Sequence, residues 1–316
     1  MSLVLGESAR SRFRRESRPP VAFEITGPKH GPVVAVLGGI SSSRHVTATQ
    51  ENSATGWWPA MVGPGRPIDT GRFRVISIDY LGEAANGAPV RTRDQADALA
   101  RALDDAAVGR LLAIVGASYG GMIALSFGSA YPHRVGHLIV ISAAHASDPM
   151  ATALRVLQRR VVELGVATGQ PAQALAIARG IALTGYGTPA EFRSRFAPEE
   201  AGHAGLACRN IEQHLAAAGE AFARSCSPAR FLALSRSLDL HRIRPEDVLV
   251  PAAVLAVRED QLVPIEQARE LAARLGAPCR LWELESIYGH DAFLNEPALL
   301  APILGDLLTA STGLMS

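Results

Sequence analysis

The chain is short of cysteine, of excess charge and of long apolar runs. Three cysteines among 316 residues give no framework of paired disulfides and indicate a reducing compartment. A balance of 31 basic against 30 acidic residues argues against nucleic acid or an anionic membrane as a partner. No run reaches the ~18–20 apolar residues of a membrane span. Residues 1–20 are polar and Arg-rich, without the apolar segment of a secretory signal. We expect a cytoplasmic protein that begins with a disordered arm over residues 1–20.

What the sequence does contain is enough apolar residues for a large core, arranged in strand-length and helix-length runs. Hydrophobic residues make up 48% of the chain. We predict strands at residues 32–37, 73–80, 111–115, 137–142, 252–257 and 279–284, and the weak alternation of residues 21–26 indicates an edge strand. Helical spacing predicts helices at residues 92–106, 122–130, 265–275 and 298–308. We expect Thr92 to cap the first of these helices, and residues 56–67 to form a loop.

The middle of the chain differs from the regions on either side of it. From residue 147 to residue 240 the strand pattern stops and the apolar spacing becomes helical, with breaks at residues 185–189, 197–198 and 227–228. Elsewhere strands alternate with helices, which predicts a doubly wound, mostly parallel sheet. We therefore expect an α/β core made of residues 21–146 and 241–316, with residues 147–240 forming a helical lid over it.

One short motif lies between a predicted strand and a predicted helix. Residues 116–120 read G-A-S-Y-G, which fits the pattern G-x-S-x-G. A serine on a sharp turn between a strand and a helix is the nucleophile elbow of α/β-hydrolases. The flanking glycines suit this turn because strand and helix approach closely where a Cβ is missing. The motif predicts the α/β-hydrolase fold, with Ser118 as the nucleophile.

An acid and a histidine follow the serine in the order that this fold requires. Asp260 comes just after the strand predicted at 252–257, and His290 comes after the strand at 279–284. His290 would accept the proton of Ser118, and Asp260 would hold the imidazole. Each residue alone has a structural reading, but the ordered set favours a catalytic triad. His45 and His145 are the competing bases, because both lie near strand ends.

A serine nucleophile of this kind also needs two N–H donors for the oxyanion of its tetrahedral intermediate. One donor should be the backbone of Tyr119, which follows the nucleophile directly. The other should come from the loop at residues 38–41, after the second predicted strand.

Several motifs resemble those of the homoserine O-acyltransferases, in the homoserine O-acetyltransferase group of the α/β-hydrolase superfamily. The tryptophan pair and the G-P-G…D-T run within residues 56–70 are similar to a distinctive stretch of that family. S-Y-G-G-M at 118–122 resembles its S-M-G-G-M elbow, with Tyr119 in place of methionine. G-H-D-A-F-L at 289–294 matches its G-H-D-x-F-L ending, and Arg179 with Tyr186 resembles its A-R…Y pair. The loop at 39–42 departs from the family pattern, since Ile40 stands where leucine is usual.

The resemblance implies a role for each matching residue. The backbone N–H of Ile40 would complete the oxyanion hole. Arg179 would pair with the carboxylate of homoserine, with Tyr186 beside it, and Asp291 would receive the amino group. Acyl-CoA would be the co-substrate, with an acetyl donor narrowly favoured over succinyl, in methionine biosynthesis. No metal is expected, and apolar surface on the lid suggests a homodimer.

Three other readings stay open at this stage. A carboxylesterase would use the same triad with water as the acceptor, and would not need a clamp for the two charges of an amino acid. A serine O-acyltransferase would differ only in its acceptor. A non-catalytic module of the same fold is the third reading, and an intact triad argues against it.

Overall fold

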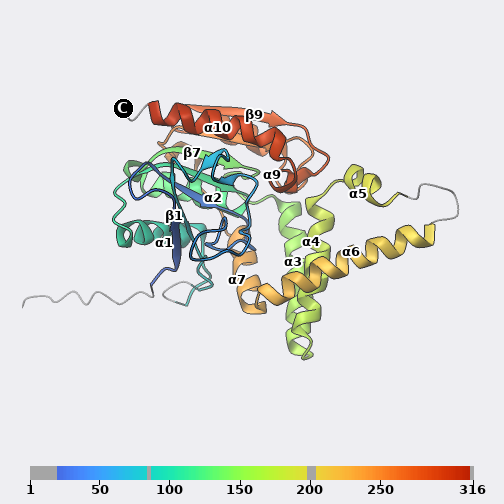
Figure 1. The fold of residues 1–316 in the computed structure, drawn as a ribbon. Coiled ribbons are helices and arrows are strands. Elements are labelled where there is room, and N and C mark those ends of the chain that lie inside the picture. The colour runs from blue at the N-terminus through green and yellow to red at the C-terminus, as the bar shows by residue number, and fades with distance from the viewer. Residues whose placement is uncertain (1–19, 84–86, 198–203, 314–316) are drawn as a thin grey trace, which may run out of the picture.

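The computed structural model describes residues 20–83, 87–197 and 204–313. The arm predicted for residues 1–20 lies outside this range except for Pro20. The described part of the chain forms a sheet of seven strands with helices on both faces, and a group of helices that extends away from the sheet (Figure 1).

The large sheet has the order β1-β5-β2-β6-β7-β8-β9. Only β1 runs antiparallel to its neighbour, β5, and all the other pairs in this sheet are parallel. This confirms the predicted α/β-hydrolase fold class. The strands are β1 (Phe23–Thr26), β2 (Val33–Leu37), β5 (Arg74–Ile78), β6 (Leu111–Ala117), β7 (Val135–Ile141), β8 (Ala252–Val257) and β9 (Cys279–Leu284).

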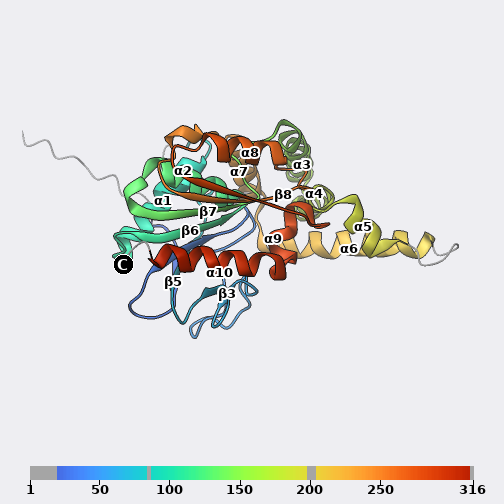
Figure 2. The ribbon, with the colours of Figure 1, turned by 90° about the horizontal axis from the view of Figure 1, so that it is seen from above.

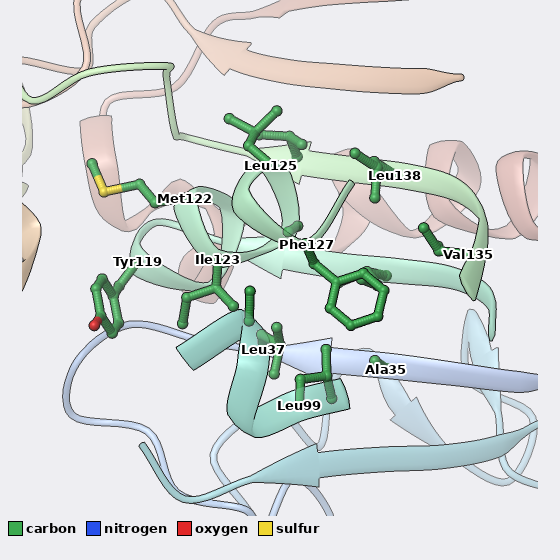
Figure 3. Close-up of a cluster of buried hydrophobic side chains, with 14 of the residues drawn as sticks. Ala35, Leu37, Leu99, Tyr119, Met122, Ile123, Leu125, Phe127, Val135 and Leu138 are labelled. Atoms are coloured by element: carbon green, nitrogen blue, oxygen red, sulfur yellow. The ribbon is translucent and has the colours of Figure 1, made fainter. Parts of the chain in front are cut away.

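Helices cover both faces of this sheet (Figure 2). One face carries α1 (Thr92–Asp105), α2 (Tyr119–Ala130) and α8 (Ile265–Arg274), and the other carries α10 (Pro297–Gly313), which follows the short α9 (Ala292–Asn295). Figure 3 shows part of the first core, where Ile123 and Phe127 of α2 lie near Leu37 of β2 and Leu99 of α1. These four side chains are fully buried, as the near-continuous apolar runs of the strands predict.

Two local expectations were wrong. Residues 56–67 are not all loop, because β3 (Val62–Gly63) pairs in parallel with β4 (Ile68–Asp69) in a small second sheet. Thr92 does not cap α1. Arg91 occupies the N-cap position, and its backbone N–H donates to the Asp94 carboxylate at 2.8 Å. The Thr92 side chain is buried and its hydroxyl bonds the ring of His241 at 2.8 Å, so it is not available to the helix end.

Five helices lie between β7 and β8 in the described sequence, and we call α3 to α7 the helical insertion. They are α3 (Pro149–Ala167), α4 (Pro171–Tyr186), α5 (Pro189–Phe196), α6 (Ala204–Ser225) and α7 (Pro228–Asp239). The helical insertion predicted from the spacing is present, although the break between α3 and α4 was not foreseen. Figure 1 shows α3 and α4 side by side, with α6 crossing them. Among the described residues, no helix is long and apolar enough to cross a membrane.

Candidate active site

Ser118 lies at a sharp turn between β6 and α2. Its backbone has φ 54°, a left-handed conformation that is unusual for a residue with a side chain. A Cβ on Gly116 would come within 2.3 Å of the Gly120 carbonyl oxygen, and one on Gly120 within 2.1 Å of the Leu37 carbonyl oxygen. Both flanking glycines are therefore required by close backbone approach, as the motif implied.

The structure brings Ser118, His290 and Asp260 into one hydrogen-bonded line. The Oγ atom of Ser118 lies 2.8 Å from Nε2 of His290, and Nδ1 of His290 lies 2.7 Å from Oδ2 of Asp260. The other Asp260 oxygen accepts the backbone N–H groups of Leu262 at 2.8 Å and Val263 at 3.0 Å. These bonds fix the carboxylate, which in turn orients the imidazole.

Burial and neighbouring charge have opposite effects on the pKa of His290. Its side chain is almost completely buried, and burial by itself lowers the pKa of an imidazole. The neighbouring Asp260 carboxylate outweighs that effect, so the pKa of His290 is raised above its ordinary value. The ring is thus suited to accept a proton from Ser118 and to hold it as an imidazolium.

The two competing histidines lie elsewhere. His45 places Nδ1 3.0 Å from the Glu24 carboxylate and Nε2 2.7 Å from the Ala54 carbonyl oxygen. His145 has Glu270 as its nearest acidic partner, at 3.8 Å. Neither of them lines the pocket that holds Ser118 and His290. The geometry therefore favours His290 as the base.

The loop expected to supply the second oxyanion donor lies against the elbow. Gly39 and Ile40 line the same pocket as Ser118. The carbonyl oxygen of Gly38 accepts the backbone N–H of Gly120 at 2.9 Å and the Tyr80 hydroxyl at 2.7 Å. Tyr119 is the first residue of α2, where backbone N–H groups lack partners within the helix. This arrangement is compatible with an oxyanion hole formed by the N–H groups of Ile40 and Tyr119.

The three residues assigned to the acceptor by resemblance also meet in this pocket. Arg179 and Tyr186 come from α4, and Asp291 follows His290 directly. The Arg179 guanidinium lies over the ring of Tyr186, 5.4 Å from its centroid, and the Tyr186 and His290 ring centroids are 5.7 Å apart. Burial raises the pKa of Asp291, while the charges of His290 and Arg179 act to lower it. The pocket therefore presents a cation and an acidic group near the triad histidine.

Arg155 of α3 is a pocket residue that the sequence did not single out. It is one of four lining residues at helical spacing, with Ala151, Leu154 and Gln158. The helical spacing of these residues is visible in the sequence, but nothing distinguishes Arg155 there from the 29 other arginines of the chain. Its Nε donates to Asp239 at 2.6 Å, and its guanidinium also bonds the Ser147 hydroxyl.

Trp57 and Trp58, which belong to the distinctive stretch at 56–70, have different surroundings. Trp58 is buried and donates its ring N–H to the Phe293 carbonyl oxygen at 2.9 Å, which ties this stretch to the segment after His290. Trp57 stacks on Trp58 and lines the pocket. Within the described residues, no group of three or more histidine, cysteine or acidic side chains could hold a metal ion.

Comparison with known proteins places the chain in a family. Residues 32–297 match the model of the alpha/beta hydrolase fold. The chain is 41% identical over 298 residues to a homoserine O-succinyltransferase of Xanthomonas campestris pv. campestris, covering 93% of this chain and 79% of that protein. It is 31% identical over 320 residues to a homoserine O-acetyltransferase of Thermus thermophilus, covering 87% of this chain and 81% of that protein.

A solved structure shows the same fold. The homoserine O-acetyltransferase of Bacillus anthracis superposes with a TM-score of 0.80 at 18% identity, covering 91% of each chain. Sequence and architecture thus agree with the motifs from which the triad was predicted, and the chain belongs to the homoserine O-acyltransferase family of α/β-hydrolases.

Proposed function

We propose that this protein transfers an acyl group from an acyl-CoA thioester to the hydroxyl of L-homoserine, through an acyl-enzyme on Ser118. In the first half-reaction, Ser118 Oγ attacks the thioester carbonyl while His290 takes its proton. The C–S bond then breaks, and His290 returns the proton to the departing thiol of CoA. The N–H groups of Tyr119 and Ile40 stabilise the oxyanion of the tetrahedral intermediate.

The second half-reaction uses the same groups. The homoserine hydroxyl gives its proton to His290 and attacks the acyl carbonyl, and the ester bond to Ser118 breaks as His290 protonates Oγ. The observation that carries this proposal is the presence of both Arg179 and Asp291 in the pocket beside the triad. A guanidinium can grip a carboxylate with two hydrogen bonds, and a carboxylate accepts from an ammonium group. A carboxylesterase would have no use for this pair.

For the acyl donor, we propose succinyl-CoA in place of the acetyl donor that the sequence narrowly favoured. In the described part of the chain, the ion pairs of Arg155 and Arg159 both go to Asp239. Two buried guanidinium groups share one carboxylate there, and Arg155 faces the pocket. Asp148 also lines the pocket, but it caps α3 by accepting the N–H of Met150 at 2.7 Å. The local excess of one guanidinium group over the Asp239 carboxylate suits the distal carboxylate of a succinyl group.

The direct test is a matrix of steady-state rates: acetyl-CoA and succinyl-CoA, each with homoserine and with serine. We expect the highest kcat/KM for succinyl-CoA with homoserine. Arg155→Met should lower kcat/KM for succinyl-CoA by about 10- to 100-fold, because an ion pair in a sheltered pocket is lost, and should leave acetyl-CoA nearly unchanged. Arg160→Met is the matched control, since Arg160 is on the same helix with a side chain 79% exposed.

Each contrary outcome identifies another reading. Equal rates with both donors in the wild type would contradict the succinyl assignment. Faster reaction with serine would make the protein a serine O-acyltransferase. Hydrolysis of a simple ester as fast as transfer would favour a carboxylesterase.

We also propose that two copies associate through the helical insertion. Leu157 and Leu164 of α3 are 59% and 65% exposed, and Ile177 of α4 is 50% exposed, so apolar side chains of both helices face outward. Light scattering at micromolar concentration should give the mass of a dimer, and Leu157→Glu with Leu164→Glu should convert it to a monomer. Leu249→Glu, at an exposed position outside the insertion, should not. A monomeric wild type would contradict this proposal.

A further inference from the structure

Tyr119 has a second attachment that the elbow motif does not require. Its side chain is fully buried and its hydroxyl lies 2.7 Å from the Ser237 hydroxyl of α7, in the helical insertion. Figure 3 shows Tyr119 at the edge of the core cluster, with its hydroxyl directed away from Ile123, Leu37 and Leu99. The residue that follows the nucleophile therefore has its backbone in the elbow and its side chain bound to the insertion.

A second buried tyrosine joins Tyr119 to the other side of the oxyanion hole. The Tyr80 ring meets the Tyr119 ring edge to face, with centroids 5.1 Å apart and planes at 89°. The Tyr80 hydroxyl donates to the Gly38 carbonyl oxygen at 2.7 Å, just before Gly39 and Ile40. In the first turn of α7, Arg230 donates to the Tyr80 carbonyl oxygen at 2.8 Å. A continuous set of contacts thus runs from α7 through two tyrosines to the loop at residue 38.

The second oxyanion residue also contacts the insertion. The Ile40 side chain packs against the buried cluster of the insertion formed by Val162, Leu175, Ala178, Phe222 and Phe231. Both residues whose N–H groups are assigned to the oxyanion therefore have side chains that contact the helical insertion as well as the core of the sheet. A rigid protein interior transmits a displacement of such side chains to their backbones.

We propose that the Tyr119–Ser237 hydrogen bond is a positioning contact through which the helical insertion sets the geometry of the oxyanion hole. This inference rests on the proposed function, because it assigns the backbone N–H of Tyr119 to the oxyanion. The tyrosine hydroxyl never touches the substrate. It acts through the placement of the N–H group on the same residue, and donors of this kind must lie within a narrow range of distances from the developing charge.

Two variants test the contact. Tyr119→Phe removes the hydroxyl alone, and Ser237→Ala removes its partner. Each should lower kcat by about 10- to 100-fold, because a small misplacement of a catalytic donor is costly. Both half-reactions should slow by a similar factor, since both pass through an oxyanion. The KM values for donor and acceptor should change by less than about threefold. The double variant should lose little more than either single one, because both substitutions remove the same interaction.

Tyr131→Phe is the matched control. Tyr131 directly follows α2, and its hydroxyl donates to the Asp97 carboxylate at 2.8 Å, far from Ser118 in the helix. Its loss should lower Tm without lowering kcat. If Tyr119→Phe and Tyr131→Phe lower Tm alike and both leave kcat within about twofold of the wild type, the positioning role is wrong.

Failure of this inference can be distinguished from failure of the proposed function. Mass spectrometry of the wild type with the acyl-CoA donor tests for acyl-Ser118 first. A wild type that forms no acyl-Ser118 overturns both. A wild type that forms it, together with unchanged kcat in Tyr119→Phe, overturns only the positioning contact. If Tyr119→Phe does not fold, the kcat of Ser237→Ala tests the positioning contact, since that substitution changes a side chain outside the elbow.

Discussion

Ser118→Ala should reduce turnover by about 10³-fold or more while leaving the fold intact. Only the Oγ atom is removed, and the glycines that allow the tight turn on each side remain. Without Oγ there is no acyl-enzyme, and the N–H donors and the substrate pocket alone supply little of the rate. Turnover should be measured with an acyl-CoA donor and homoserine, and the acyl adduct should be mapped by mass spectrometry.

The histidines provide the control for this prediction. His290→Ala should abolish formation of the acyl-enzyme, because Nε2 is the base 2.8 Å from Ser118 Oγ. His145→Ala should retain near-normal turnover, because His145 does not line the pocket. An inactive His145→Ala with an active His290→Ala, or an adduct on a residue other than Ser118, would mean that the triad is misassigned.

Arg179→Ala should lower kcat/KM for the acceptor by roughly ten- to a thousandfold. The loss follows because the carboxylate of the amino acid would lose its partner in a pocket sheltered from water. Acylation of Ser118 by the donor should be nearly unchanged, since that half-reaction needs no amino acid. Pre-steady-state release of CoA measures the first half-reaction, and acyl transfer to homoserine measures the second.

Arg236→Ala is a suitable control for Arg179→Ala. Arg236 also belongs to the helical insertion, but its guanidinium pairs with Glu163 at 2.9 Å and it does not line the pocket. Equal damage by Arg179→Ala to both half-reactions would contradict the acceptor clamp. Arg179 would then be a structural residue that packs on the rings of Tyr186 and Phe222.

The residues of the triad could be predicted because each of them lies next to a short sequence pattern that identifies it. Gly116 and Gly120 mark the elbow, and the ends of two predicted strands give the positions of Asp260 and His290. The bounds of β8 and β9 agree with the predicted ranges, and each strand is followed directly by a charged residue, Arg258 or Glu285. These glycines and strand ends lie within a few residues of the catalytic side chain that they identify.

The contacts across the chain could not be predicted in this way. Tyr119 was visible as a departure from the family elbow, but Ser237 is 118 positions away and no local pattern links the two. Arg155 faces the pocket because of the rotation in which α3 packs against α4 and α7. Thr92 was assigned to a helix end that its buried hydroxyl does not serve. The surroundings of each of these side chains depend on which face of its helix is buried. That cannot be read from a single sequence without the fold.

The elbow also limits how this protein could be redesigned. Gly116 and Gly120 are fixed by backbone contacts, Ser118 is fixed by its chemistry, and Ala117 is fully buried at the end of β6. Residue 119 differs from the other four because its side chain hydrogen-bonds a residue of the helical insertion, Ser237. An engineer who grafts a different helical insertion onto this core would therefore have to choose residue 119 and its partner together, and could leave the rest of the elbow untouched.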